Sequence, residues 1–229
     1  MNFFQRFFGH WSTIRHHRKL VRKLCFKQGL YWQGLTHDLS KYSPTEFWNG
    51  VKFYTGTKSP HYKEREAHGY SRAWLHHKGR NKHHAEYWQD IRPNGKTEPI
   101  EIPFKYLLEM LCDRIAASMT YLGDKYTDKE PLKYYNDHKE ENDFHMQSRA
   151  LLENLLLMVE KYGIDATMKA GKIIMVTDKE KLLSMLKHTQ SDLIEDILTD
   201  YFRLYGDDLS IAAILQIIEC LITNASFKN

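Results

Sequence analysis

Hydrophobic side chains in the first half of the chain recur every three or four residues, which is the spacing of helices that bury one face. Ile14 and Val21 share one face of a helix that this spacing predicts over residues 13–28. Gly29 supplies an end to that helix. The stretch 30–39 is mostly apolar and predicts a second, buried helix.

Capping and turn residues divide the next part of the chain. The run Ser43–Glu46 predicts a helix start, because a serine can cap, a proline fits the first turn and a glutamate completes a capping box. A further helix is predicted over residues 62–77. Glycines and prolines over residues 79–103 predict a loop, with a short hairpin around Asn94 and Gly95.

The strongest helix signal covers Phe104–Leu122, which is apolar almost all round and therefore predicts a central, buried helix. Asp113 lies in the middle of it. Burying a carboxylate is costly unless the group is paired or bound to a metal. Ala116 and Ala117, one turn later, leave room for other groups to approach. Asp113 is therefore a candidate ligand, with a buried salt bridge as the alternative.

Helical patterns resume after a polar stretch and continue to the C-terminus. They predict helices over residues 144–162, 178–188, 190–204 and 208–224, and a short strand over residues 171–176. The fold class predicted for the whole chain is all-α. We expect two parts: a helical bundle over residues 1–165 and a small, mostly helical appendage over residues 166–229.

Composition excludes some classes of protein. A net charge of +4 over 229 residues is no strong signal for nucleic-acid binding, and the apolar runs are too short to span a membrane. The three cysteines lie far apart, which predicts buried, reduced thiols in a cytoplasmic protein. The first eight residues hold four phenylalanines but no signal-peptide cleavage site. We expect these phenylalanines to dock on the domain, with contact to a membrane surface as the alternative.

Histidine is the unusual component, because ten of the 13 histidines lie between His10 and His84. This clustering predicts either a metal or catalytic centre or a solvated basic surface. Imidazole and carboxylate groups suit divalent Mn, Fe, Co, Ni and Zn, and helical cores usually draw such ligands from separate helices. In chain order the candidate ligands are His17, His37, Asp38, His76 or His77, His83 or His84, and Asp113.

Adjacent histidines compete for the same role. The apolar stripe of the first helix favours His17 over His16. The stripe of the helix over residues 62–77 favours His77, although His76 remains open. For the pair at residues 83–84 the competing interpretation is a polar loop near the mouth of the site. Basic residues that follow, such as Arg80, are expected near a substrate phosphate unless they are simply solvated.

Four segments resemble the motifs of the HD-domain superfamily of metal-dependent phosphohydrolases, and they follow in the family's order. They are the His-x-x-x-Val run His17–Val21, the apolar-His-Asp-x-x-Lys run Gly34–Lys41, the histidine pair within Leu75–Asn81, and the aspartate helix Met110–Ile115. The resemblance covers roughly half of the chain. It implies an HD-like helical bundle that holds one or two divalent ions, whether Mn, Fe, Ni, Co or Zn.

The resemblance also implies an activity and a set of roles. The reaction would be hydrolysis of a phosphate ester, a nucleotide or a small phosphometabolite, by metal-activated water. Asp38 and Lys41 would act in catalysis, and Arg80 is expected to neutralise charge on the phosphoryl oxygens. The metal ligands would be His17, His37, Asp38, His76, His77, His84 and Asp113.

Departures from the HD pattern keep other hypotheses open. The gap from His17 to His37 is short for the family. Only His61 and His68 are available as the additional histidine of two-metal members, and the pair at residues 83–84 is not a usual feature. The same scaffold could serve a di-iron oxygenase or a non-catalytic module that senses a nucleotide, and a homo-oligomer is compatible with each. The whole chain also resembles an uncharacterised bacterial family, some members of which are called catalases, but it has no haem-ligand motif.

Overall fold

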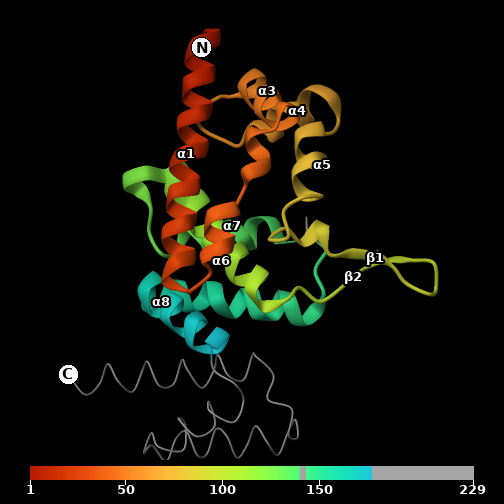
Figure 1. The fold of residues 1–229 in the computed structure, drawn as a ribbon, viewed down its shortest axis with the longest axis vertical. Helices are drawn as coiled ribbons and strands as arrows, with labels where there is room; N and C mark the ends of the chain where they lie inside the picture. Colours follow the sequence, from red (N-terminus) through yellow and green to blue (C-terminus); the bar gives the residue numbers. More distant parts are fainter. Residues whose placement is uncertain (140–142, 177–229) are drawn as a thin grey trace, which may run out of the picture.

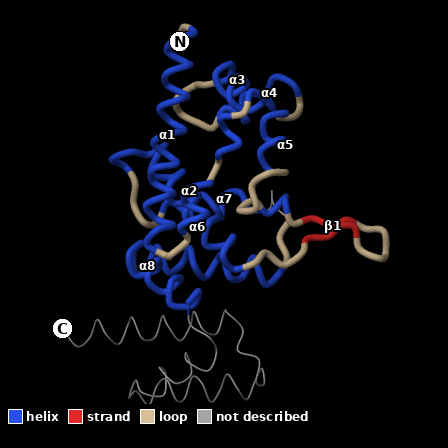
Figure 2. The backbone as a smooth tube through the Cα atoms, viewed as in Figure 1, coloured by secondary structure: helices blue, strands red, loops and turns tan. Residues whose placement is uncertain are grey.

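The computed structural model describes residues 1–139 and 143–176, and this part of the chain is all-α apart from one small hairpin. Figure 1 shows how the helices are arranged, and Figure 2 shows the hairpin projecting from them. The helices are α1 Phe3–Lys27, α2 Tyr31–Thr36, α3 Pro44–Phe53, α4 Pro60–His68, α5 Arg72–Lys78, α6 Phe104–Leu122, α7 Glu130–His138 and α8 Met146–Val176. Three short 3₁₀ helices are η1 Leu39–Tyr42, η2 Ala85–Tyr87 and η3 Gly123–Lys125, and the strands are β1 Gln89–Ile91 and β2 Thr97–Pro99.

Helix α6 is the centre of the core, as its apolar surface predicts. It packs against α1, α7 and α8, and its bounds are those expected from the sequence. Leu108, Leu111 and Ile115 are fully buried within it. Each such side chain contributes about 2 kcal/mol through the apolar area that it removes from water. The hydrophobic effect therefore fixes α6 in place, and with it the polar groups that α6 carries.

Helix α1 begins at Phe3, ten residues before the predicted start. Asn2 caps it: the Asn2 side chain accepts a hydrogen bond from the Gln5 amide, and the Gln5 side chain accepts one from the Asn2 amide, both at 2.9 Å. Reciprocal capping of this kind satisfies two amides that would otherwise lack partners. The extra turns carry His10 to the face that meets α3.

Glycines allow α1 and α3 to approach closely. A Cβ on Gly50 of α3 would come within 2.0 Å of His10 Nε2, and a Cβ on Gly9 would come within 2.5 Å of the Tyr54 ring. The His10 ring is 7% exposed and contacts the rings of Phe47 and Tyr54. The rings of His10 and Tyr54 thus occupy the space that a side chain at Gly50 or Gly9 would need.

The second predicted helix is much shorter than expected, and only part of the predicted segment is buried. Helix α2 ends at Thr36, so His37 and Asp38 follow the helix and do not lie on it. Leu35 and Leu39 are each 50% exposed. The prediction of a buried helix over residues 30–39 was therefore only partly correct: a short helix forms and Leu30 joins the core, but Leu35 and Leu39 lie on the surface.

The helix predicted over residues 62–77 is divided in two. Gly69, at φ +77°, ends α4, and α5 starts at Arg72. The buried Glu64 carboxylate links the two helices, since it accepts hydrogen bonds from the Ser71 hydroxyl and from the backbone amides of Arg72 and Ala73. A carboxylate at a helix N-terminus satisfies free amides and interacts favourably with the helix dipole. Glu64 therefore sets where α5 begins.

The hairpin prediction was correct, but the strand predicted over residues 171–176 was wrong. β1 and β2 are antiparallel around the turn at Asn94 and Gly95. Residues 171–176 continue α8, which bends at Gly163. Met168 and Ala170 are almost fully buried, so continued helical packing on the bundle outweighs the local preference for a strand. The boundary predicted at residue 165 falls within α8, and the helices predicted beyond residue 177 lie outside the described residues.

No helix in the described part of the chain is both long enough and apolar enough to cross a bilayer.

The contact between α1 and α3 can be tested with Gly50→Ala. We expect this change to lower the free energy of unfolding by about 1–3 kcal/mol, because the buried His10 ring cannot move aside without disturbing its neighbours. Denaturant titration measures the change. Gly79→Ala is the matched control, since Gly79 has φ −75° and its nearest atom would lie 3.5 Å from the new Cβ. An equal effect in both variants would contradict the close packing.

Candidate metal centre

A cluster of histidines and aspartates lies where five parts of the fold meet. His17 comes from α1, and Asp113 comes from α6. His37 and Asp38 occupy the turn between α2 and η1. The remaining three members are His77 of α5 and the loop residues His83 and His84. Segments that are distant in sequence thus place their imidazole and carboxylate groups side by side.

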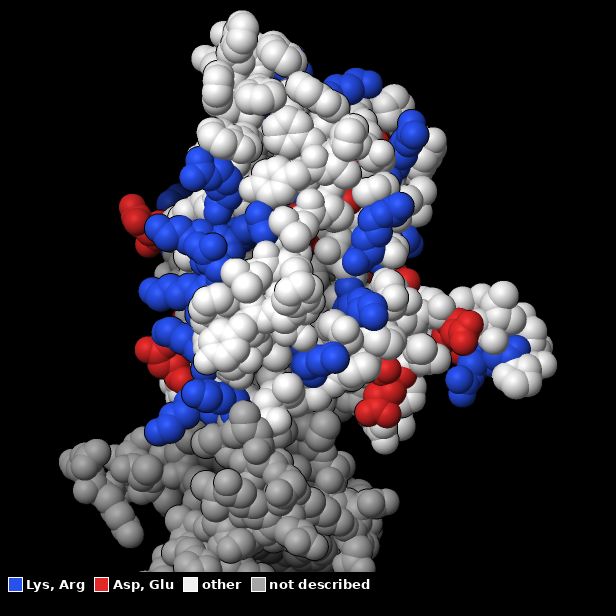
Figure 3. Space-filling view, in the orientation of Figure 1, with Lys and Arg blue, Asp and Glu red and all other residues white. Residues whose placement is uncertain are grey.

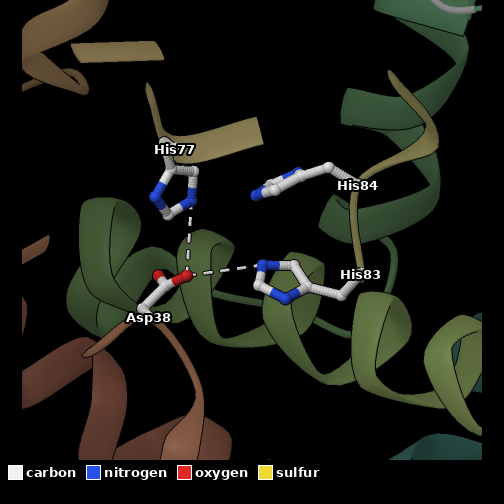
Figure 4. Close-up of side chains that lie close together, drawn as sticks. All are labelled: Asp38, His77, His83 and His84. Carbon is white, nitrogen blue, oxygen red and sulfur yellow. Dashed lines mark ion pairs between the residues drawn. The ribbon is translucent and has the colours of Figure 1, made fainter. Parts of the chain in front are cut away.

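Asp38 lies at the centre of the cluster and is 1% exposed. Its Oδ2 is 3.3 Å from His37 Nε2 and 3.7 Å from His17 Nε2. Its other oxygen, Oδ1, is 3.3 Å from His77 Nε2 and 3.4 Å from His83 Nε2. Figure 4 shows Asp38 facing His77 and His83, with His84 beside them. The two carboxylate oxygens therefore face two different sets of imidazoles.

Two groups of four side chains have the composition and spacing of metal sites, and they share Asp38. In each group the potential ligand atoms lie within 4.8 Å of one another. Asp113 Oδ1 belongs to the group on the α1 side, 2.9 Å from His17 Nε2 and 3.3 Å from His37 Nε2. The first group is His17, His37, Asp38 and Asp113, and the second is Asp38, His77, His83 and His84.

The donor atoms themselves fit metal ligation. Buried nitrogen and oxygen atoms normally have hydrogen-bond partners, and leaving one without a partner costs about 1–3 kcal/mol. Six atoms of the two groups make no hydrogen bond to the described residues, although some of them lie in ion pairs, as Asp38 Oδ2 does with Lys41. They are Nε2 of His17, His37, His83 and His84, and both carboxylate oxygens of Asp38. Divalent ions would satisfy all six atoms.

The turn at Asp38 is held in an uncommon conformation. Asp38 has φ 54° and ψ 26°, the left-handed region, and it is the one residue other than glycine with positive φ in the described part of the chain. Such a conformation costs about 1–3 kcal/mol and persists where surrounding contacts fix it. Arg18 supplies two of these contacts, because its guanidinium donates to the backbone carbonyls of Leu35 and His37 at 3.1 and 2.8 Å.

Glu109 orients one imidazole from each group. Its Oε1 lies 2.9 Å from His37 Nδ1 and 3.1 Å from His83 Nδ1. A carboxylate that accepts the Nδ1 proton fixes the ring and leaves Nε2 free to bind a metal. Glu109 precedes Asp113 by one helical turn, so the two carboxylates lie on the same side of α6. One helix therefore provides both a candidate ligand and the group that orients two others.

Glu46 orients the two histidines of α5 in the same way. Its two oxygens lie 2.6 Å from His76 Nδ1 and 2.8 Å from His77 Nδ1. The predicted capping box is therefore only half formed: Ser43 accepts from the Glu46 amide, but the Glu46 carboxylate is turned toward the histidines. His77 Nε2 faces Asp38, whereas His76 belongs to neither ligand group.

Both aspartates are held in their charged forms. Burial opposes ionisation of Asp38, but His37 and Lys41 outweigh it and hold the pKa of Asp38 well below its usual range. Burial likewise opposes ionisation of Asp113, and His17 and His37 lower its pKa well below the usual range. Charged carboxylates are the form that binds a metal.

The histidines respond differently to the same surroundings. Burial disfavours the charged form of His37, yet Asp38, Asp113 and Glu109 together raise its pKa well above the ordinary value. At His84, burial and then the neighbouring His83 lower the pKa well below that value. His84 is therefore neutral, as a nitrogen ligand must be.

Lys41 is the cation closest to the cluster. Its Nζ lies 2.6 Å from Asp38 Oδ2, and its side chain is one-third exposed. Burial opposes its charge, but Asp38 and Asp113 outweigh that and raise the pKa of Lys41. The ammonium group thus stays charged beside the shared carboxylate and reaches the open side of the cluster.

A cavity of about 790 Å³ opens beside the cluster. His17, His77, His83, His84 and Asp113 form part of its lining. The cations that line it are Lys41, Lys58, Arg65, Arg114 and Lys133. This volume suits a small molecule, and the exposed edge of the cluster is accessible from it.

The structure brings together six of the seven candidate ligands, namely His17, His37, Asp38, His77, His84 and Asp113. His76 is held away from the cluster by Glu46. Arg80 lies on the surface outside the cavity lining, where it donates to the carbonyl of His76. His17 is buried while its neighbour His16 is exposed, which agrees with the helical stripe.

The sequence left one important residue open and gave no site role to two others. His83 was the alternative to His84 as a candidate ligand; it is 1% exposed and faces Asp38, and both histidines belong to the second group. Glu46 was assigned to a cap, and Glu109 was not considered. A signal for Glu109 was present, because it is a second carboxylate one turn from Asp113 in an otherwise apolar helix.

Metal ions should stabilise the folded protein through these side chains. We expect Zn²⁺, Co²⁺ or Mn²⁺, added to chelator-treated protein, to raise the thermal unfolding midpoint, because an ion at 100 times its Kd contributes about 2.7 kcal/mol. His17→Ala should reduce this rise. His16→Ala is the matched control, since His16 is the exposed neighbour on the same helix. An equal rise in the wild type and both variants would show that His17 is not a ligand.

Comparison with known proteins gives a family without an assigned activity. No curated protein and no solved structure shows significant similarity to the chain. One family model matches residues 6–158, and it is described as a family of unknown function, DUF5662. The matched span includes every residue of the two ligand groups and their orienting glutamates. The chain therefore belongs to the DUF5662 family.

Proposed function

We propose that this protein is a metal-dependent hydrolase of phosphate esters with a two-metal centre, to which Asp38 would contribute both carboxylate oxygens. The observation that carries the proposal is the shared carboxylate, whose two oxygens face two separate sets of ligands. An aspartate between two sets of imidazoles is the arrangement needed to hold two ions close together, as in two-metal phosphoryl-transfer sites. The HD-like order of the motifs His17, His37-Asp38 and Asp113 supports the same hypothesis.

The ligand chemistry favours transition metals over Mg²⁺ and Ca²⁺. The two groups together offer five imidazoles and two carboxylates, whereas Mg²⁺ and Ca²⁺ prefer oxygen ligands. Mn, Fe, Co, Ni and Zn all suit this set. When bound, such ions supply Lewis acidity that activates water and polarises a phosphoryl oxygen at neutral pH.

The protein's own residues would bind and orient the substrate. A phosphate ester in the cavity meets Lys41 beside the cluster, with Lys58, Arg65 and Lys133 elsewhere in the lining. Cations fixed around a phosphoryl group stabilise the charge on its oxygens, and this stabilisation is a major part of catalysis in such transfers. Arg80 does not line the cavity, so Lys41 is the stronger candidate for this role.

Orientation of the ligands is the second contribution of the chain. Glu109 holds His37 and His83, and Glu46 holds His77, each through the ring nitrogen that points away from Asp38. Rings fixed in this way need little reorganisation when an ion binds, which favours affinity and a constant geometry. This bonding pattern explains why two buried glutamates surround the cluster.

A second candidate function is di-iron oxygen chemistry. It is favoured by the nitrogen-rich composition of the ligand groups, because imidazole and carboxylate together suit iron. The two hypotheses differ in the metal that they require and in their dependence on oxygen.

Metal analysis together with an activity screen tests the proposal. Protein purified without chelator should contain about two equivalents of Mn, Co, Ni, Zn or Fe, and it should hydrolyse nucleotides or p-nitrophenyl phosphate. The double variant His37→Ala/Asp38→Ala should lose both properties, whereas the exposed His16→Ala should retain them. Two equivalents of iron with an oxygen-dependent spectral change, and without hydrolysis, would favour the oxygenase. Absence of metal after reconstitution would exclude both activities and leave a non-catalytic module.

Lys41→Gln separates catalysis from metal binding. We expect the variant to keep its metal but to lose about 100-fold or more in kcat/KM for the phosphate ester, because a charge-stabilising group is removed. Elemental analysis and steady-state kinetics measure the two properties. Lys125→Gln, at an exposed lysine of η3, is the matched control and should behave like the wild type. Unchanged kcat/KM in Lys41→Gln would remove this lysine from the mechanism.

A further inference from the structure

The outward side of α1 is apolar at its N-terminal end. Phe4, Phe8 and Trp11 are 68%, 56% and 39% exposed, and their spacing places them on one side of the helix. A further phenylalanine of this segment, Phe7, packs inward, with its ring centroid 5.5 Å from that of Phe47. The expected docking of the N-terminal phenylalanines on the domain therefore holds for Phe7 but not for Phe4 and Phe8.

The same side of α1 becomes basic further along the helix. Arg15, Lys19 and Arg22 are exposed and continue the three- and four-residue spacing. With Arg18 they line a groove of about 420 Å³, and no carboxylate is among its lining residues in the described part of the chain. The first acidic residue of the whole sequence is Asp38. This groove therefore attracts anions without competition from a neighbouring negative charge.

A second apolar edge borders the basic groove. Tyr31, Trp32 and Leu35 of α2 are 59%, 73% and 50% exposed, and Leu35 lines the groove. Figure 3 shows Lys and Arg side chains gathered along α1, with uncharged surface at its N-terminal end. We call this surface, from Phe4 to Arg22 on α1 and from Tyr31 to Leu35 on α2, the α1–α2 face.

We propose that the α1–α2 face binds the surface of an anionic lipid bilayer. Aromatic and aliphatic side chains such as Phe4, Phe8 and Trp32 would enter the interfacial region, and Arg15, Lys19 and Arg22 would contact lipid phosphates. Surface-bound helices combine exposed apolar side chains with a basic face in this way, and each cation near an anionic surface adds to the affinity. This proposal is independent of the proposed phosphate-ester hydrolysis, because none of these residues belongs to the candidate metal centre.

Charge and apolar character favour a bilayer over other occupants. A second copy of the chain would bring two strongly basic faces together, and like charges in contact oppose association. A nucleic acid would match the cations, but it would leave the apolar edges at Phe4, Phe8 and Leu35 in water. An anionic bilayer satisfies both components, since its phosphates pair with the cations and its interface accepts the apolar side chains.

Vesicle co-sedimentation of the full chain tests the proposal. Vesicles of phosphatidylcholine with phosphatidylglycerol should bind the protein, whereas vesicles of phosphatidylcholine alone should bind it at least about tenfold more weakly. Added salt should weaken the binding, because it screens the contribution of the cations. Inorganic phosphate at the same ionic strength should have no further effect, since a lone phosphate lacks the apolar interface.

Paired variants identify the surface that is responsible. Arg15→Gln/Arg22→Gln should reduce binding to the anionic vesicles by about 25-fold, because each cation contributes about a fivefold factor. Phe4→Ser/Phe8→Ser should reduce binding to a similar extent by removing exposed apolar area. Arg92→Gln/Lys96→Gln and Ile91→Ser, all on the exposed hairpin, are the controls matched in charge and in apolar character. Circular dichroism confirms that each variant is folded.

Three outcomes would overturn the proposal. The first is the absence of binding to anionic vesicles by the folded wild type. The second is an equal loss of binding in the hairpin controls, which would show only a general charge effect. The third is binding of a fluorescent RNA, or concentration-dependent dimerisation, that Arg15→Gln/Arg22→Gln abolishes while vesicle binding is unchanged. Binding that is selective for anionic vesicles and lost in the α1 variants alone would support it.

Discussion

The buried carboxylate of Asp38 has lost its hydration, and the arrangement of the rest of the site depends on how that loss is compensated. Placing a carboxylate where it is 1% exposed costs several kcal/mol unless opposite charges or a metal compensate for the lost hydration. His37 and Lys41 supply part of that compensation. Both oxygens nonetheless lack hydrogen-bond partners among the described residues. Two such atoms among five imidazoles could hold metal ions, which would supply the ligand contacts that these atoms lack.

Different helices supply the groups that surround Asp38 and the groups that orient them. The central helix α6 is fixed by its apolar surface, and it uses its polar side for Asp113 and Glu109. Glu46 on α3 and Glu64 on α4 connect to α5, the first through its histidines and the second through its N-terminus. Three buried glutamates thus position groups that come from separate parts of the chain. Their burial is tolerated because each accepts hydrogen bonds from several donors.

The α1–α2 face and the candidate metal centre share structural elements but use opposite sides of them. On α1, His17 points toward Asp38, whereas the neighbouring His16 lines the basic groove. Arg18 connects the two regions, since it lines the groove and also donates to the carbonyl of His37. A long helix with a buried stripe and an exposed stripe can serve a core and a surface at once. The groove and the cavity share no lining residue, so the proposed bilayer contact would use residues other than those around the cluster.

The sequence by itself determined the all-α class, the bounds of α6, the hairpin turn and most of the candidate ligands, because helical periodicity, turn residues and buried charge are local signals. It did not determine which histidine of α5 faces the site, nor that both histidines of the following loop do. These positions depend on Glu46 and Glu109, which are distant in sequence and become neighbours only when α3, α5 and α6 pack together. The sequence also placed His37 and Asp38 on a helix, whereas Arg18 holds them in a turn after it. The tertiary structure decided these points because the free energy of burying and pairing charged groups exceeds local helix preference.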